Sequence, residues 1–130
     1  MPTSSAVTRG IRIEVESRFD AGRSRPGASH WFHVYTIRIT NGGADTVQLL
    51  SRHWIITDAD GKVEEVRGPG VVGRQPVIEP GESFEYSSAC PIGTSFGTMH
   101  GTYQMVVSRS GEPFDVEIAP FALGEPHSIN

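Results

Sequence analysis

Apolar and polar side chains alternate along most of the chain with a period of two residues. Between Gly10 and Phe19 the apolar positions are Ile11, Ile13 and Val15, and the positions between them are charged. Successive side chains of a β-strand point to opposite faces, so this pattern predicts a strand with one buried face and one wet face. Further strands are predicted at residues 31–40, 47–56, 62–66, 77–78, 83–89, 98–108 and 114–118.

Turn signals separate these segments, and no stretch keeps a helical period for three turns. Asp60-Gly61 is the clearest turn, because glycine takes a positive φ at little cost and aspartate tolerates it. Fifteen glycines and nine prolines are spread along the chain, as many short elements require. Seven or eight short strands with turns between them predict an all-β fold, a two-sheet antiparallel sandwich.

The alternation changes phase once, near Leu50 and Ser51. Val47 lies in one phase, whereas Trp54 and Ile56 continue in the opposite phase together with Arg52. Because the side-chain period is two, a change of phase needs one inserted residue. The sequence therefore predicts a β-bulge near Leu50-Ser51.

The length of 130 residues predicts one domain. We expect a sandwich over residues 9–124, a flexible N-terminus over residues 1–8 and a polar tail over residues 125–130. Residues 20–29 contain two glycines and a proline and are predicted to be a long, mobile connection.

Charge and composition exclude several functional classes. Eleven basic against fifteen acidic residues give a net charge of −4, which disfavours nucleic-acid binding through a basic surface. No apolar run approaches the ~20 residues that would cross a bilayer, so no membrane insertion is expected. The start of the chain lacks the basic and apolar parts of a signal peptide. The single cysteine, Cys90, allows no internal disulfide, which fits a cytoplasmic protein.

Residues 68–73 read Gly-Pro-Gly-Val-Val-Gly, which spells G-x-G-x-x-G. In dinucleotide-binding folds this motif opens a helix whose amides hold a pyrophosphate. Pro76 and Pro80 follow too closely for such a helix, so that interpretation fails. Two alternatives remain. The loop amides, flanked by Arg67 and Arg74, could form an anion-binding nest, or the loop is a strand connection that needs glycine dihedrals.

The histidines and the cysteine form no local metal or catalytic motif. His30 and His33 would point to opposite faces of a strand, so they cannot chelate one ion. Cys90 precedes a proline and has no neighbouring base, although it could meet His100 in space. No metal site, catalytic residue or cofactor is therefore predicted.

Two other features leave their roles open or have a simple explanation. Residues 58–61 begin like an EF-hand loop, but the twelfth position is Pro69 rather than glutamate, so a hairpin turn explains them. Five apolar residues at loops or strand ends either cap the core or form an exposed binding patch: Trp31, Phe32, Val71, Val72 and Phe96.

Four blocks of the sequence resemble the ApaG family: residues 47–58, 64–76, 80–86 and 97–103. The likeness runs from about Ile11 to Leu123 and implies an immunoglobulin-like or fibronectin type III-like sandwich. Bacterial members of that family are small cytoplasmic proteins linked to cobalt resistance and magnesium efflux. Similar domains in F-box proteins and in a DNA polymerase delta-interacting protein imply protein–protein contact, and the family supplies no catalytic residues.

These observations predict a non-enzymatic binding module with an unknown protein partner, since function on a sandwich lies in grafted sites. The expected site consists of Arg67, Gly68, Gly70, Val71, Val72, Gly73 and Arg74. The first alternative is binding of a small anion or a pyrophosphate nucleotide by the loop amides. The second is direct binding of Co²⁺ or Mg²⁺.

Overall fold

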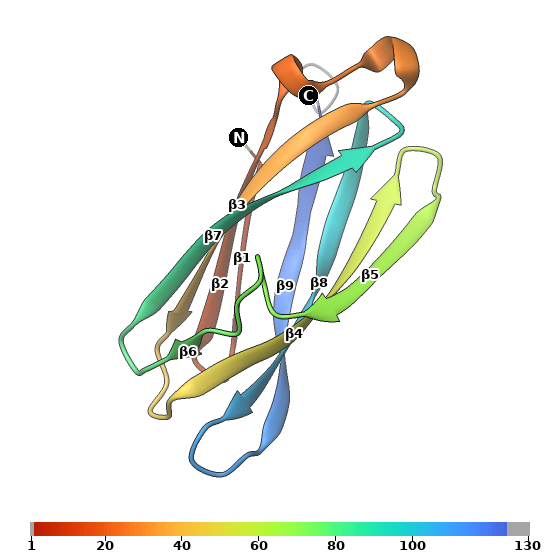
Figure 1. Ribbon diagram of the computed structural model, residues 1–130. Helices are drawn as coiled ribbons and strands as arrows, with labels where there is room; N and C mark the ends of the chain where they lie inside the picture. Colours follow the sequence, from red (N-terminus) through yellow and green to blue (C-terminus); the bar gives the residue numbers. More distant parts are fainter. Residues whose placement is uncertain (1, 125–130) are drawn as a thin grey trace.

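Two antiparallel β-sheets packed face to face make up the computed structural model, which describes residues 2–124 (Figure 1). The strands are β1 (Thr3–Thr8), β2 (Ile11–Phe19), β3 (Trp31–Asn41), β4 (Val47–Asp58), β5 (Val63–Pro69), β6 (Val77–Ile78), β7 (Ser83–Ile92), β8 (Phe96–Val107) and β9 (Pro113–Gly124). Two 3₁₀ turns, η1 (Ala21–Arg23) and η2 (Pro26–Ala28), join β2 to β3. The predicted all-β antiparallel sandwich is confirmed.

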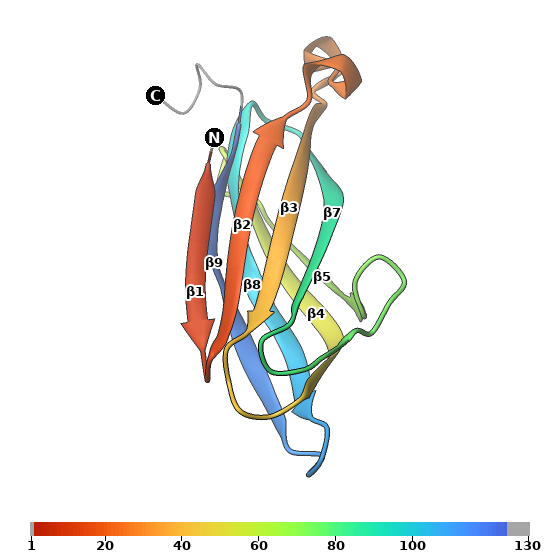
Figure 2. The ribbon, with the colours of Figure 1, turned by 90° about the vertical axis from the view of Figure 1, so that its left-hand side faces the viewer.

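The chain passes three times between the sheets. One sheet has the order β1-β2-β3-β7, and the other has the order β5-β4-β8-β9, with β6 pairing at the far end of β4. Figure 2 shows the first sheet in front of the second. Strands β5 and β6 both pair with β4. The connection between them carries the glycine motif.

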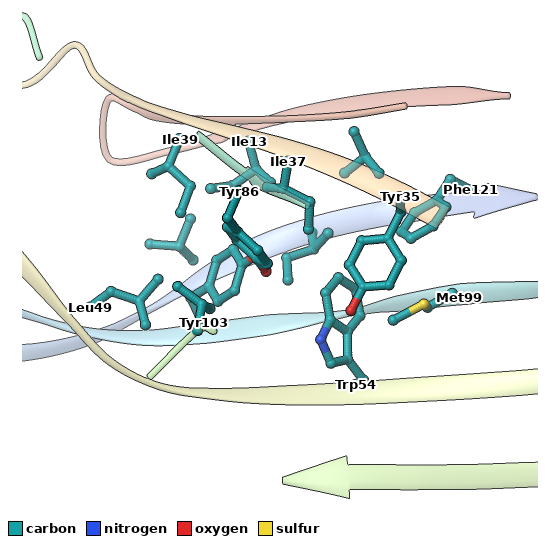
Figure 3. Close-up of a cluster of buried hydrophobic side chains, with 14 of the residues drawn as sticks. Ile13, Tyr35, Ile37, Ile39, Leu49, Trp54, Tyr86, Met99, Tyr103 and Phe121 are labelled. Atoms are coloured by element: carbon teal, nitrogen blue, oxygen red, sulfur yellow. The ribbon is translucent and has the colours of Figure 1, made fainter. Parts of the chain in front are cut away.

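The residues in the predicted apolar phases fill the space between the sheets. Ile13, Ile37 and Leu49 are fully buried. At one end of the core, Trp54 meets Tyr35 edge-on, with ring centroids 5.6 Å apart, and Phe121 lies 6.0 Å away (Figure 3). Aromatic pairs in this geometry add to the stabilisation from buried area.

The register between β4 and β8 shifts between Leu49 and Ser51, which confirms the predicted bulge. The inserted residue leaves Leu50 exposed and lets both Leu49 and Trp54 face the core. A second shift, between Met99 and Gly101 in the β8–β9 pair, has no counterpart in the predictions.

The N-terminus differs from the flexible segment expected over residues 1–8. Thr3–Thr8 forms β1, which pairs with β2 along its whole length and raises the strand count from the predicted seven or eight to nine among the described residues. Ser4 Oγ also donates to the carbonyl of Ala119 in β9, 2.9 Å away. The side chains of β1 are small and polar, so the hydrophobic pattern gives no sign of a strand that backbone pairing holds. The predicted polar tail, residues 125–130, lies outside the described residues.

The connection predicted to be long and mobile, residues 20–29, contains both 3₁₀ turns. Ser24 Oγ donates to the carbonyl of Asp20 at 2.7 Å and accepts from the amide of Phe32 at 2.9 Å. A buried serine thus ties the loop to the start of β3.

Candidate functional site

The glycine loop, residues 68–74, is a tight hairpin that projects beside β7 (Figure 2). The amide of Val71 donates to the carbonyl of Arg74 at 2.8 Å, and the amide of Arg74 donates back at 2.9 Å. Between them, Val72 has a φ of 43° and Gly73 a φ of 78°. Positive φ at both central residues is the requirement of a type I′ turn. The next element after the motif is strand β6 rather than a helix, in agreement with the exclusion of a dinucleotide-binding fold.

Each glycine of the motif has its own structural reason. A Cβ at Gly68 would lie 3.0 Å from Nη1 of Arg52, and a Cβ at Gly70 would lie 2.2 Å from the carbonyl oxygen of Arg74. Gly73 has open space around it but needs its positive φ. The strand-connection alternative accounts for the whole motif.

Most amides of the loop are already bonded within the chain. The amide of Gly70 donates to the carbonyl of Leu50 at 2.8 Å, and those of Val71 and Arg74 close the turn. Of residues 70–74, Val72 and Gly73 are the two whose amides donate to no other residue within 2–124. The predicted anion-binding nest, which needs successive free amides, would therefore have only the two amides of Val72 and Gly73 as donors.

The two arginines that flank the loop have partners outside it. Arg67 is exposed, with Nη2 3.7 Å from Oε1 of Glu65. The guanidinium of Arg74 lies over the ring of Phe84, 5.4 Å from its centroid. Both arginine side chains therefore already have a contact within the protein.

Arg52 supports the glycine loop through hydrogen bonds from its side chain. The sequence analysis did not assign Arg52 to the site. Its Nη1 donates to the carbonyls of Pro69 and Gly70, at 2.9 Å and 2.8 Å. The alternation of apolar and polar residues could have identified Arg52, because Arg52 lies in the same phase as Trp54 and Ile56, which face the core. A charged residue in a core-facing phase indicates a specific contact.

The five apolar residues left open by the sequence divide between core and surface. Val71 is 1 % exposed and belongs to the core, whereas Val72 is 53 % exposed and Phe96 is 44 % exposed. Trp31 and Phe32 are partly buried. The hydrophobic side chain that the loop presents to solvent is therefore that of Val72.

The structure brings Cys90 beside His33, whereas the sequence left open a meeting with His100. Cys90 and His33 pair across β7 and β3, and Nδ1 of His33 lies 3.2 Å from the Cys90 carbonyl. His100 lies in the other sheet, opposite Ile55. This contact uses the Cys90 backbone, so it does not place a base at the thiol.

Possible metal ligands do not converge. Within residues 2–124, no group of three or more His, Cys, Asp or Glu side chains is arranged to hold a metal ion. Oδ1 of Asp58 accepts from the amides of Asp60 and Lys62, at 2.9 Å and 3.0 Å. This carboxylate closes the β4–β5 hairpin, as the turn prediction required.

The buried thiol gives the protein a pH-dependent stability. Burial, with a smaller contribution from Glu64, raises the pKa of Cys90 from 9.0 to about 12. Between these values the unfolded chain loses the thiol proton and the folded protein keeps it, so the free energy of unfolding falls as pH rises. We expect Cys90→Ala to reduce this decline by up to about 1.4 kcal/mol per pH unit above pH 9. Urea unfolding of both proteins at pH 8, 9 and 10 measures the difference, and parallel curves would contradict the assignment.

The sequence matches the model of the ApaG domain over residues 21–107. It is 54% identical over 121 residues to the protein named ApaG of Bradyrhizobium sp. (strain ORS 278), covering 93% of this chain and 92% of that protein. The ApaG protein of Methylorubrum extorquens (strain PA1) is 53% identical over 122 residues, covering 94% and 93%. A crystal structure of a Bordetella pertussis protein assigned as ApaA superposes with a TM-score of 0.86 at 49% identity, covering 89% of this chain and 94% of that one. Nothing helical in residues 2–124 is both long and apolar enough to cross a bilayer.

Proposed function

We propose that this chain, which belongs to the ApaG family, is a non-enzymatic binding module that contacts a protein partner through its glycine loop. The observation that carries the proposal is Val72. A β-branched residue rarely takes a left-handed conformation, yet Val72 does so at the tip of the hairpin and leaves 53 % of its surface exposed. Strain of this kind costs about 1–3 kcal/mol and tends to persist at functional sites.

Arg67 and Arg74 extend this contact surface on the two arms of the hairpin. Both residues are exposed, and they flank the tip in the sequence. An apolar tip between two cations suits a partner that offers an apolar pocket with acidic residues around it. The family resemblance supports a cytoplasmic pathway linked to cobalt resistance and magnesium efflux as the setting of this contact.

Replacing Val72 by asparagine separates binding from stability. Asparagine tolerates the left-handed region and creates the Asn-Gly pair that type I′ turns prefer, so Val72→Asn should stabilise the fold by about 1 kcal/mol. The same change removes the apolar tip, so capture of the partner from a lysate of the native cell should fall. Urea unfolding and quantitative affinity capture are the two measurements.

Val77→Asn is the matched control, because Val77 is 56 % exposed and lies outside the loop. It should keep every partner that the parent protein captures. Gly70→Trp provides a second loop variant, since a side chain there collides with the Arg74 backbone. Capture of the same proteins in the same amounts by all three variants would remove the loop from the interface.

A further inference from the structure

A cavity of about 350 Å³ lies between the glycine loop and β7. It is lined chiefly by Tyr35, Arg52, Val72, Gly73, Tyr86 and Ser88. Its volume falls at the lower end of small-molecule sites, which span roughly 300–1,000 Å³. The lining combines a cation, hydroxyl groups and an apolar rim.

Arg52 brings an uncompensated positive charge to this cavity. A guanidinium has five N–H donors, and both hydrogen bonds that Arg52 makes within residues 2–124 leave Nη1, toward Pro69 and Gly70. Its Nε and Nη2 therefore keep three donors without a partner in that part of the chain. No carboxylate of the described residues forms an ion pair with it. A partly buried cation without a counter-charge is costly, and an anion would relieve that cost.

Uncharged hydroxyl groups share the lining of the cavity with Arg52. The hydroxyl of Tyr35 and the side chain of Ser88 are neighbours in this lining, and the hydroxyl of Tyr86 is hydrogen-bonded to that of Tyr103. Burial raises the pKa of Tyr35 and of Tyr86, while the nearby charge of Arg52 acts weakly in the opposite direction. Both phenols are therefore uncharged at neutral pH and do not neutralise Arg52.

We propose that this cavity binds the carboxylate or phosphate group of a small organic anion, with Arg52 as the anchoring cation and Tyr35 and Ser88 as hydroxyl donors. The planar fork of a guanidinium matches both kinds of oxyanion. Gly68 gives the guanidinium its room, because a Cβ there would lie 3.0–3.1 Å from three atoms of the Arg52 side chain. The anion lies beneath the loop rather than on a row of loop amides, and its binding needs no protein partner.

Matched small molecules test the charge requirement directly. Propionate, inorganic phosphate and uncharged propionamide are titrated into the ¹⁵N-labelled full chain to about 20 mM, a range that detects millimolar affinities. Propionate or phosphate should shift the amides of Val72, Gly73 and Ser88, and propionamide should not. The tighter of the two anions identifies the preferred group. Equal responses to propionate and propionamide, or no response to either anion, would overturn the proposal.

The anion affinities of three variants show which residues form the binding site. Arg52→Gln should weaken anion binding at least about tenfold, and Ser88→Ala about threefold, whereas Arg67→Gln should change it less than twofold. Because Arg52 also supports the loop, the spectrum of Arg52→Gln shows whether the hairpin is retained. Ser88→Ala leaves both Arg52 hydrogen bonds in place. Its affinity for the anion therefore tests the cavity even if Arg52→Gln loses the hairpin. Undiminished binding by Ser88→Ala together with Arg52→Gln would rule out this cavity.

Discussion

Gly101→Ala is expected to destabilise the fold by about 3 kcal/mol or more, because overpacking against fixed backbone has no cheap relief. A Cβ at Gly101 would lie 2.0 Å from the carbonyl oxygen of His53 and 3.2 Å from Cα of Trp54. Both atoms belong to β4, the central neighbour of β8, and residue 101 stands at the register shift toward β9. The main chain of β4 can move only by breaking pairing on both of its sides. Urea unfolding followed by fluorescence gives the loss in free energy of unfolding.

A graded series of glycines provides the controls. A Cβ at Gly97 would lie 2.6 Å from the carbonyl oxygen of Thr57, whereas one at Gly27 would meet nothing within 4 Å. Gly97→Ala should therefore lose less stability than Gly101→Ala, and Gly27→Ala should stay within about 0.5 kcal/mol of the parent. The steric explanation fails if the three variants unfold at the same urea concentration.

Trp54→Ala should cost about 4 kcal/mol, since removal of a buried tryptophan loses transfer free energy and leaves a cavity. Trp54 is 2 % exposed and contacts Tyr35, Tyr103 and Phe121 at centroid distances of 5.6 to 6.3 Å (Figure 3). A domain of this size is stable by roughly 5–15 kcal/mol, so this variant loses a large share of its free energy of unfolding. Circular dichroism is the suitable probe, because the substitution removes a fluorophore.

Trp54→Phe distinguishes packing from hydrogen bonding. The indole Nε1 is buried and has no hydrogen-bond partner within residues 2–124. Phenylalanine removes that unpaired donor while keeping an aromatic ring in the cluster, so a loss of about 1–2 kcal/mol is expected. Phe96→Ala, at an exposed ring, should have little effect. Equal losses for Trp54→Ala and Trp54→Phe would show that ring packing is not the source of stability.

The largest difference between the predictions and the structure concerns which residues of the glycine loop are free to bind a ligand. The motif led to the amides of residues 68–73 and to Arg67 and Arg74, yet three amides of residues 70–74 are used inside the chain. Arg52 lies sixteen residues before the first glycine of the motif and reaches it because β4 pairs with β5. A local motif cannot reveal a contact made across two strands. The identity of the residues that Arg52 meets depends on register, which the hairpin and the bulge set together.

The sequence by itself determined eight of the nine strands in residues 2–124, their buried faces and the bulge at Leu50-Ser51. Each follows from side chains close together in the chain, because the pleat repeats every two residues. Only the tertiary structure decided the pairing of β1, the meeting of Cys90 with His33 and the place of Arg52 beneath the loop. These depend on which distant backbones pair and on how far a long side chain reaches. Strand β1 shows the limit most clearly, since backbone hydrogen bonds hold it and they leave no mark on the pattern of apolar residues.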